Sequence, residues 1–335
     1  MKVTISVAIY NVASFIEECV RSLYEQTLDD IEILLIDDCT PDDSIEIALR
    51  VLEEYPNRKS QVRVFRHEHN LGIAATKTDG YKEALGDYVV VIDGDDYVDR
   101  RFAELLYGKA IAEDADLAIC DFFRKRKTSC RHDTLVPNGV IGNGDNVRAD
   151  IINRRVPPFL TCKLVRRSVM MDNDVVWPVK GLAEDTVISV TMAYYATRIA
   201  HVAEPLYYYR MHQQSVSHVA DEASILKNYD SSFSNVEITL QFLRREKALS
   251  QYGYGAVIHK LRTKNRLLPI VDKRKYRKLW LRTYPEINKV IFFGNKDYKA
   301  TYRERIWFIC IVTGLYPKFK KKLHSPKYRV PLEWL

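Results

Sequence analysis

The chain has 335 residues, of which 47% are hydrophobic and 28% charged, and a formal net charge of +7. This composition indicates a soluble globular protein with enough apolar residues for one large core or two domains. The six cysteines show no C-x-x-C spacing, which argues against a zinc site and against a redox pair. The N-terminus runs straight into a strand-like segment, so we expect no signal peptide and a cytoplasmic location, where free thiols belong.

Strand-like and helix-like patterns alternate over the first 85 residues. Residues 3–10 form an apolar run typical of a strand, residues 13–26 carry a helical apolar pattern, and residues 31–36 form a second apolar run. A strand, a helix and a strand within about 35 residues predict a βαβ unit and therefore a parallel sheet. The alternation continues with a helix after residue 44, a strand at 62–65, a turn at 70–72 and a helix at 73–85. The predicted fold class is α/β.

The most informative motif is Asp93-Gly94-Asp95-Asp96, which follows the buried strand predicted over residues 88–92. Ligands of α/β sheets bind at the carboxyl ends of the strands. Asp93 and Asp95 point the same way in an extended backbone, so their charges repel unless a cation lies between them. Carboxylate oxygens suit Mg²⁺ or Mn²⁺, and such sites usually share the ion with substrate phosphates. Alone, the motif leaves a solvated acidic turn equally open.

Two common nucleotide-binding motifs are absent from the sequence. No G-x-G-x-x-G follows the first predicted strand, and no G-x-x-x-x-G-K-[S/T] occurs in the chain. Their absence argues against a dinucleotide-dependent oxidoreductase and against a P-loop NTPase. An acidic strand end in their place indicates a nucleotide diphosphate held through a metal ion.

A set of short segments occurs in a recognisable order and spacing. These segments are residues 5–11, 19–27, 33–44, 70–72, 86–96, 163–167, 184–185 and 208–217. Each is weak alone, but together they resemble glycosyltransferase family 2 over residues 1–218. The resemblance implies a GT-A fold, with a mostly parallel nucleotide-binding sheet flanked by helices, as the catalytic domain over residues 1–218. Residues 219–335 carry no motif and are expected to form a largely helical, basic extension.

The resemblance implies an inverting transferase that uses a nucleotide-diphosphate sugar, most often UDP-linked. It implies that Asp38 pairs with the imide N–H of the base, that Ala8 and Tyr10 flank the base, and that Asp93 lies near the ribose. The family usually has Ala-Arg-Asn in the helix that follows the turn at 70–72, where this chain has Thr-Lys-Thr. Lys77 keeps the positive charge but loses the bidentate fork of arginine, so its contacts with the base or phosphate are expected to differ.

The resemblance also implies a metal site that holds Mn²⁺ or Mg²⁺. Asp95 is implied as the main metal ligand, and Asp96 as a second one. Arg210, His212 and Ser215 lie in a segment that closes on the diphosphate and metal in similar enzymes, and side chains of these types suit phosphate oxygens. We assign His212 to the metal site, although a lone histidine is more often a surface residue.

Asp185 is implied as the catalytic base, with Glu184 beside it as the other candidate. The pair opens the apolar segment 187–193, which indicates a helix, and a helix N-terminus favours ionised carboxylates. A carboxylate on the opposite side of the sugar from the diphosphate takes the acceptor proton during in-line attack, which inverts the anomeric carbon. On its own, the pair is more typical of a plain helix start.

Charge divides the chain unevenly. Residues 244–335 carry 24 Lys and Arg against 6 Asp and Glu, whereas residues 1–243 carry 27 against 38. No RNA- or DNA-binding motif accompanies the basic runs, so we expect no nucleic-acid partner and favour the anionic inner face of the cell membrane. The apolar segment 306–316 is too short to cross a bilayer. Either it lies in the membrane interface with Trp307 and residues 318–322 as anchors, or it packs as a buried terminal helix.

The expected function is sugar transfer to a glycan or lipid-linked glycan in the synthesis of cell-envelope or capsular polysaccharide. A catalytically inactive subunit that binds nucleotide sugars or glycans is the alternative, and the complete acidic motif with Asp185 favours the enzyme. A nucleotidyltransferase needs a glycine-rich loop with Arg or Lys after the first strand, and residues 10–13 lack one. The sequence does not identify the sugar or the acceptor, whose contacts we expect between residues 122 and 182.

Overall fold

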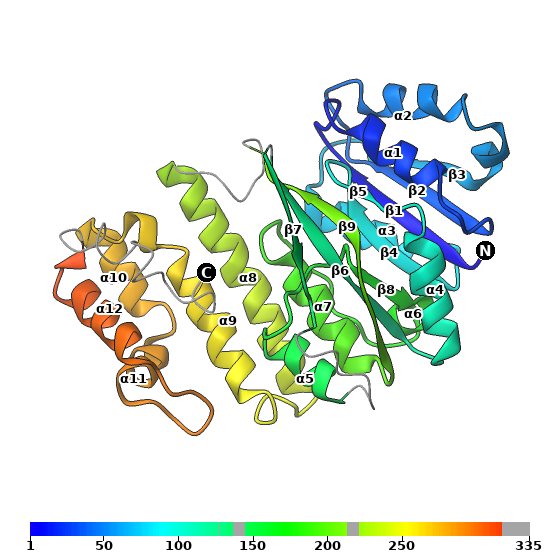
Figure 1. The fold of residues 1–335 in the computed structure, drawn as a ribbon. Coiled ribbons are helices and arrows are strands. Elements are labelled where there is room, and N and C mark those ends of the chain that lie inside the picture. Colours follow the sequence, from blue (N-terminus) through cyan, green and yellow to red (C-terminus); the bar gives the residue numbers. More distant parts are fainter. Residues whose placement is uncertain (127, 137–144, 213–220, 317–335) are drawn as a thin grey trace. The chain divides into compact units, whose positions relative to one another are not determined.

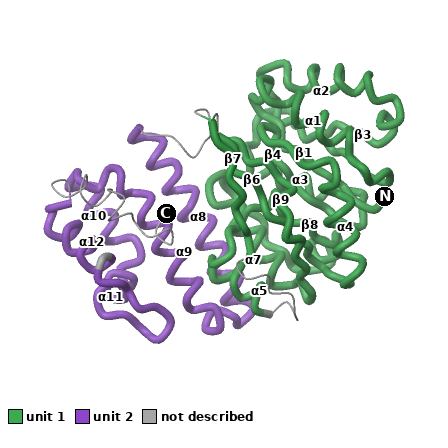
Figure 2. The backbone as a smooth tube through the Cα atoms, in the orientation of Figure 1, with its two compact units in different colours: residues 1–215 green, residues 216–335 purple. Residues whose placement is uncertain are grey.

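The computed structural model describes residues 1–126, 128–136, 145–212 and 221–316 (Figure 1). The chain divides into two compact units, residues 1–215 and 216–335 (Figure 2). The domain boundary expected after residue 218 lies outside the described residues. Within the described ranges, no helix has both the length and the apolar character that a membrane span requires.

Unit 1 is built on one mixed sheet, which has nine strands in the described residues, in the order β3-β2-β1-β4-β8-β6-β9-β5, with β7 paired to β6. The strands are β1 (Val3–Ile9), β2 (Ile31–Asp37), β3 (Val62–Arg66), β4 (Tyr88–Asp93), β5 (Tyr97–Val98), β6 (Leu117–Arg126), β7 (Ser129–Asp133), β8 (Lys163–Arg166) and β9 (Ile199–Arg210). Strands β3, β2, β1 and β4 are parallel, which confirms the predicted α/β sheet. Beyond β4 the sheet is mixed, because β8 runs antiparallel to both β4 and β6.

The helices of unit 1 alternate with single strands as far as β4 and follow less regularly after it. They are α1 (Ile16–Tyr24), α2 (Ser44–Leu52), α3 (Ile73–Lys82), α4 (Phe102–Ala112), α5 (Asp145–Ile152), α6 (Arg167–Met171) and α7 (Glu184–Tyr195). Helix α3 packs against β1, β2 and β4, and α4 packs against β6 and β9. Every residue of β1 and β2 is buried, as expected for strands covered on both faces.

Unit 2 is helical in its described residues, as the sequence predicts. Its helices are α8 (Glu222–Arg245), α9 (Gly253–Asn265), α10 (Arg274–Arg282), α11 (Pro285–Phe293) and α12 (Tyr302–Val312). Their apolar faces meet in one core, in which Trp280 is fully buried. Lys264 is also buried there, and its ammonium group donates to the carbonyl oxygens of Trp280 and Thr283. A lysine is tolerated in this core because these carbonyls accept its protons.

Of the two alternatives left open for the apolar segment around Trp307, the structure supports the buried terminal helix. The Trp307 side chain is 3% exposed, and its ring lies 5.2 Å from that of Tyr316. Helix α12 therefore buries this face inside unit 2, as in the alternative of a buried terminal helix. A capping box between Thr301 and Glu304 fixes the start of the helix. The lysines expected as further anchors, residues 318–322, lie outside the described residues.

Candidate functional site

The acidic turn lies at the carboxyl end of β4, directly beside the end of β1. Asp93 is paired with Ala8 in the parallel register, and the backbone N–H of Gly94 donates to the Ala8 carbonyl oxygen over 3.0 Å. A Cβ atom on Gly94 would lie only 2.8 Å from that oxygen. Glycine is therefore required here, because it lets the turn approach β1 closely enough to present the carboxylates that follow.

Asp95 and His212, two predicted metal ligands, lie together. The Nε2 atom of His212 is 2.9 Å from Oδ2 of Asp95, and the imidazole ring lies 4.5 Å from the ring of Phe15. The other ring nitrogen, Nδ1, is buried and has no hydrogen-bond partner in the described part of the chain. Strand β9 ends two residues before His212, and this strand delivers the histidine to the acidic turn.

The described residues contain no group of three or more His, Cys, Asp and Glu placed to hold a metal ion. Asp95 and His212 nevertheless offer one oxygen and one nitrogen ligand at the same point. Mg²⁺ and Mn²⁺ are commonly held by one or two protein ligands together with phosphate oxygens and water. The donor set thus fits an ion shared with a diphosphate and does not form a closed protein cage.

Asp96 has a different environment from its neighbour Asp95. It is 1% exposed, its Oδ2 accepts from the Tyr207 hydroxyl, and its Oδ1 accepts from the Arg210 backbone N–H over 2.7 Å. Burial, with Asp95 and Asp93 nearby, raises the pKa of Asp96 well above its usual range. Both oxygens hold β9 against the turn, so the expected metal role of Asp96 does not fit this geometry and we leave it out of the proposed ligand set.

Lys77 contacts three carboxyl groups that come from two different elements. Its Nζ atom lies 2.9 Å from Asp185 Oδ1, 3.2 Å from Glu184 Oε1 and 3.3 Å from Asp93 Oδ1. The lysine belongs to α3, Asp93 ends β4, and the two other carboxylates open α7. Ala183, the residue before that helix, has a φ of 69°, a left-handed conformation uncommon for alanine that sets the direction of the helix start.

The cluster around Lys77 is mostly buried, and its protonation equilibria reflect this. Burial and the Asp185 charge raise the pKa of Glu184 to about 8, although Lys77 opposes the shift. Burial also raises the pKa of Asp93 against the opposing effect of Lys77. Burial lowers the pKa of Lys77, but the surrounding carboxylates outweigh that effect and hold it well above its usual value. The lysine therefore remains charged, and Glu184 retains a proton over much of the neutral range.

Asp38 lies in the interior, with both of its oxygens already used. It is 1% exposed and accepts from the backbone N–H groups of Leu71 and Gly72, over 2.7 and 2.8 Å. His67 contacts Asp38 through Nδ1 at 2.8 Å and Asp79 through Nε2 at 3.1 Å. In the structure Asp38 thus holds the turn at 70–72, and its contact with a base remains a prediction. Sequence reasoning missed His67, since no motif marks it.

The remaining predicted donor contacts surround the end of β1. Ala8 is buried, whereas Tyr10 is 47% exposed just beyond the strand. The Arg210 guanidinium lies over the rings of Phe15 and Tyr97 and pairs with Glu18 at 2.7 Å. The charge of Arg210 therefore already has a partner near the acidic turn. Ser215, the last predicted contact, lies outside the described residues.

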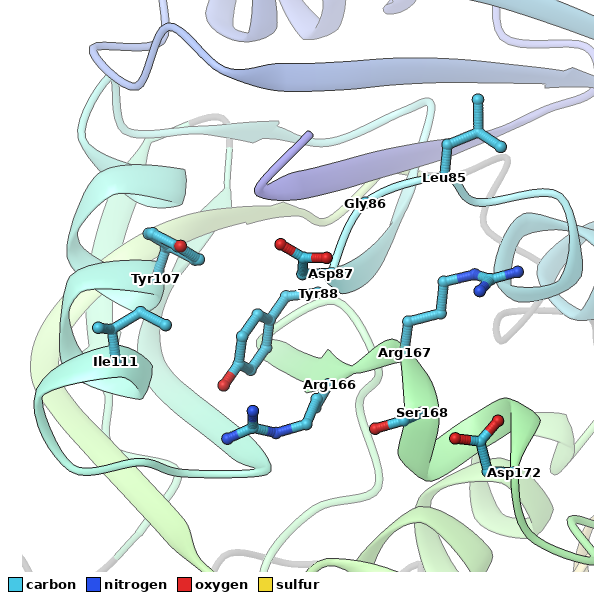
Figure 3. Close-up of a pocket in the computed structure, with 10 residues that line it drawn as sticks. All are labelled: Leu85, Gly86, Asp87, Tyr88, Tyr107, Ile111, Arg166, Arg167, Ser168 and Asp172. Atoms are coloured by element: carbon cyan, nitrogen blue, oxygen red, sulfur yellow. The ribbon is translucent and has the colours of Figure 1, made fainter.

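A cavity of about 390 Å³ lies at the other end of β4 (Figure 3). Tyr88, the first residue of β4, lines it together with Arg166 and Arg167. Arg166 is already paired with Asp114 and Asp116, at 2.8 and 3.1 Å. Because ligands of such sheets bind at the carboxyl ends of the strands, we place the functional site at the acidic turn and not in this cavity.

Comparisons with known proteins agree with this geometry. The family model for glycosyl transferase family 2 matches residues 4–157. The uncharacterized glycosyltransferase EpsJ of Bacillus subtilis is 33% identical over 230 residues, which cover 65% of this chain and 63% of EpsJ.

Two solved structures share the fold. The structure of S. aureus TarS 1–349 in complex with UDP-GlcNAc has a TM-score of 0.67 at 18% identity, covering 98% of this chain and 92% of TarS 1–349. The mannosyltransferase PcManGT of Pyrobaculum calidifontis, in complex with GDP-Man and Mn²⁺, has a TM-score of 0.54 at 14% identity, covering 97% and 88%. These likenesses confirm the GT-A-like fold. With its acidic turn in that fold and the family model matched from β1 onwards, the chain matches glycosyl transferase family 2 over residues 4–157.

Proposed function

We propose that the chain is an inverting, metal-dependent glycosyltransferase that moves a sugar from a UDP-sugar to a glycan or lipid-linked glycan in the synthesis of a cell-envelope or capsular polysaccharide. One observation carries the proposal. Asp93 from the metal side and Asp185 from the base side contact the same buried Lys77, although they lie on different elements far apart in the sequence. Such an arrangement brings leaving-group chemistry and proton transfer to one place.

The proposed transfer uses these residues in separate roles. Asp93 accepts a hydrogen bond from a donor hydroxyl, and Arg210 exchanges Glu18 for the diphosphate. Asp95 and His212 would hold Mn²⁺ or Mg²⁺, which would supply positive charge opposite the leaving diphosphate. Asp185 takes the proton of the acceptor hydroxyl while the acceptor oxygen bonds to the anomeric carbon and the bond from that carbon to the phosphate oxygen breaks.

The identity of the donor is the first point to test. We favour UDP-sugars because the TarS structure, which has the higher TM-score of the two solved structures, is a complex with UDP-GlcNAc. GDP-mannose is the alternative, from the PcManGT complex. A thermal-shift panel of UDP-GlcNAc, UDP-glucose, UDP-galactose and GDP-mannose, each with and without Mn²⁺, separates them. The proposal expects a Mn²⁺-dependent rise in Tm with at least one UDP-sugar, and no such rise with any donor contradicts it.

The proposed base is tested by Asp185→Asn. The amide keeps the shape of the side chain but takes no proton, so donor binding should persist while transfer or donor hydrolysis falls roughly 10²–10⁴-fold. Asp172→Asn, a change remote from the cluster, serves as a matched control. Turnover by Asp185→Asn at the wild-type rate would move the base assignment to Glu184. Donor binding by the wild type with no turnover at all would instead favour the inactive binding subunit.

We also propose that unit 2 meets an anionic membrane surface, which would make the protein peripheral on the inner face of the cell membrane. Supporting this, Phe292 and Phe293 at the end of α11 are 43% and 77% exposed in a region rich in lysine and arginine. Each Lys or Arg near an anionic surface is worth about 1 kcal/mol. Wild-type protein should sediment with anionic vesicles at low salt, and Phe292→Ser with Phe293→Ser should weaken this. Failure of the wild type to sediment refutes the membrane proposal alone.

A further inference from the structure

Lys77 is a charged residue that is almost fully buried, which calls for a structural reason. Its side chain is 4% exposed, yet it lies at the meeting point of α3, β4 and α7. Asp185, Glu184 and Asp93 each direct one oxygen toward its Nζ atom. Two of these contacts are hydrogen bonds, to Glu184 and Asp185, and the third is an ion pair with Asp93. Acidic side chains therefore surround Nζ, whereas the role expected from the sequence was a contact with a nucleotide base or a diphosphate.

The three carboxylates differ in how open they are. The Asp185 side chain is 21% exposed and that of Glu184 is 12% exposed. Lys77 holds Oδ1 of Asp185 at 2.9 Å, the shortest of its three contacts, and Oδ2 makes no hydrogen bond within the described residues. One oxygen of Asp185 is therefore fixed, and the other remains available to accept a proton. Glu184 is less open, and its pKa of about 8 leaves its carboxyl group protonated over much of the neutral range, so it cannot take a second proton from the acceptor there.

We propose that Lys77 is the positioning residue of the base. Its ammonium group fixes the Asp185 carboxylate and also contacts Asp93, which holds the proposed base at a constant distance from the residue proposed to contact the donor. Because the Nζ atom contacts oxygens of both residues, these oxygens lie no more than about 6 Å apart. The inference rests on the proposed function. It differs from a donor-binding role because Lys77 then acts on turnover and leaves donor affinity unchanged.

Lys77→Met tests this, since methionine keeps most of the length of the side chain and removes the ammonium group. We expect the kcat of transfer or donor hydrolysis to fall at least about 10²-fold, while the Kd of UDP with Mn²⁺, measured by calorimetry, stays within about twofold. Lys77→Arg keeps the charge with different geometry, so it should recover part of the lost kcat. A donor-binding role predicts the reverse, with UDP affinity lost in step with turnover.

A double-mutant cycle separates positioning from a general structural effect. If Lys77 acts through Asp185, adding Lys77→Met to Asp185→Asn should lower residual single-turnover rates less than about twofold further. Multiplication of the two losses would overturn the inference. Lys264→Met is the matched control, because Lys264 is also fully buried but, within the described residues, donates to the carbonyl oxygens of Trp280 and Thr283 in unit 2. Its substitution should lower Tm without this non-additivity.

A second variant and two further outcomes keep the inference testable and separate it from the proposed function. Lys77→Met combined with Glu184→Gln removes the ammonium group together with one of the acid groups that contact it, so this variant carries the test if Lys77→Met alone does not fold. Unchanged kcat in a folded variant that lacks the ammonium group would overturn the inference while the proposed function stands. Absence of both nucleotide-sugar binding and turnover in wild type would instead refute the proposed function.

Discussion

Asp95→Ala and Asp96→Ala should give opposite phenotypes, although the two residues are neighbours. Asp96 is 1% exposed and accepts from the Tyr207 hydroxyl and the Arg210 backbone N–H. Removing it leaves two donors unpaired, at about 1–3 kcal/mol each. Relief of a buried carboxylate whose pKa is raised offsets part of that loss, so we expect a net loss of about 2–3 kcal/mol in the free energy of unfolding.

Within the described part of the chain, the Asp95 carboxylate makes one side-chain hydrogen bond, to His212, and its side chain is 27% exposed. Its removal should therefore cost less than about 1 kcal/mol of stability. For a unit of this size the loss at Asp96 corresponds to a fall of roughly 5–10 °C in Tm, readable by scanning calorimetry. Calorimetric titration of UDP should show that Asp95→Ala loses the Mn²⁺-dependent gain in affinity. A stable Asp96→Ala variant beside an unstable Asp95→Ala variant would refute the division of roles.

Three further variants test other parts of the structure. Urea melts should show that Glu184→Gln is more stable than wild type at pH 9 and that the difference closes toward pH 5. The folded pKa of Glu184, about 8, lies above the usual 4.5, so protonation of this carboxyl stabilises the fold at low pH. That contribution is lost as the pH rises through 8. Burial lowers the pKa of Lys264 from 10.5 to about 7, so the folded state releases this proton at a lower pH than the unfolded state, and the stability of unit 2 should rise between pH 7 and 10. Lys264→Met should abolish that rise. Gly94→Ala should lower the affinity for UDP with Mn²⁺ at least about tenfold and lower the free energy of unfolding by about 1–3 kcal/mol, because its Cβ would lie 2.8 Å from the Ala8 carbonyl oxygen. Unchanged affinity would show that the turn tolerates displacement.

The sequence predicted the features for which the pattern of apolar residues indicates one type of secondary structure. The apolar runs at residues 3–10 and 31–36 predicted strands, and the structure confirms them as β1 and β2, which are buried along their whole length. The helical extension also followed from pattern. The apolar run around Trp307 did not specify its surroundings, because an all-round apolar helix is equally suited to a protein core and to a membrane interface. The packing of Trp307 on Tyr316 decided between them.

Within the site, the sequence could not predict in which direction each side chain points. Asp95 and Asp96 look alike in a string of letters, but one faces His212 and the other faces the core beneath β9. The meeting of Lys77 with Asp185 needs α3 and α7 to converge, which no local pattern records. The proximity of Asp95 and His212 was implied by the resemblance to a family and not by periodicity or spacing.

The charge balance of the site explains why a metal and a diphosphate should bind together. Around the acidic turn and the start of α7, the carboxylates of Asp93, Glu184 and Asp185 share one lysine. Burial raises the pKa of Asp93 and of Glu184, so protons offset part of the negative excess. A diphosphate alone would add negative charge to this surface and be repelled, whereas a divalent cation beside Asp95 reverses the sign of that interaction. We therefore expect a site with this excess of carboxylates to bind the metal complex of a nucleoside diphosphate more tightly than free phosphate or free sugar, and to release it when the metal is removed.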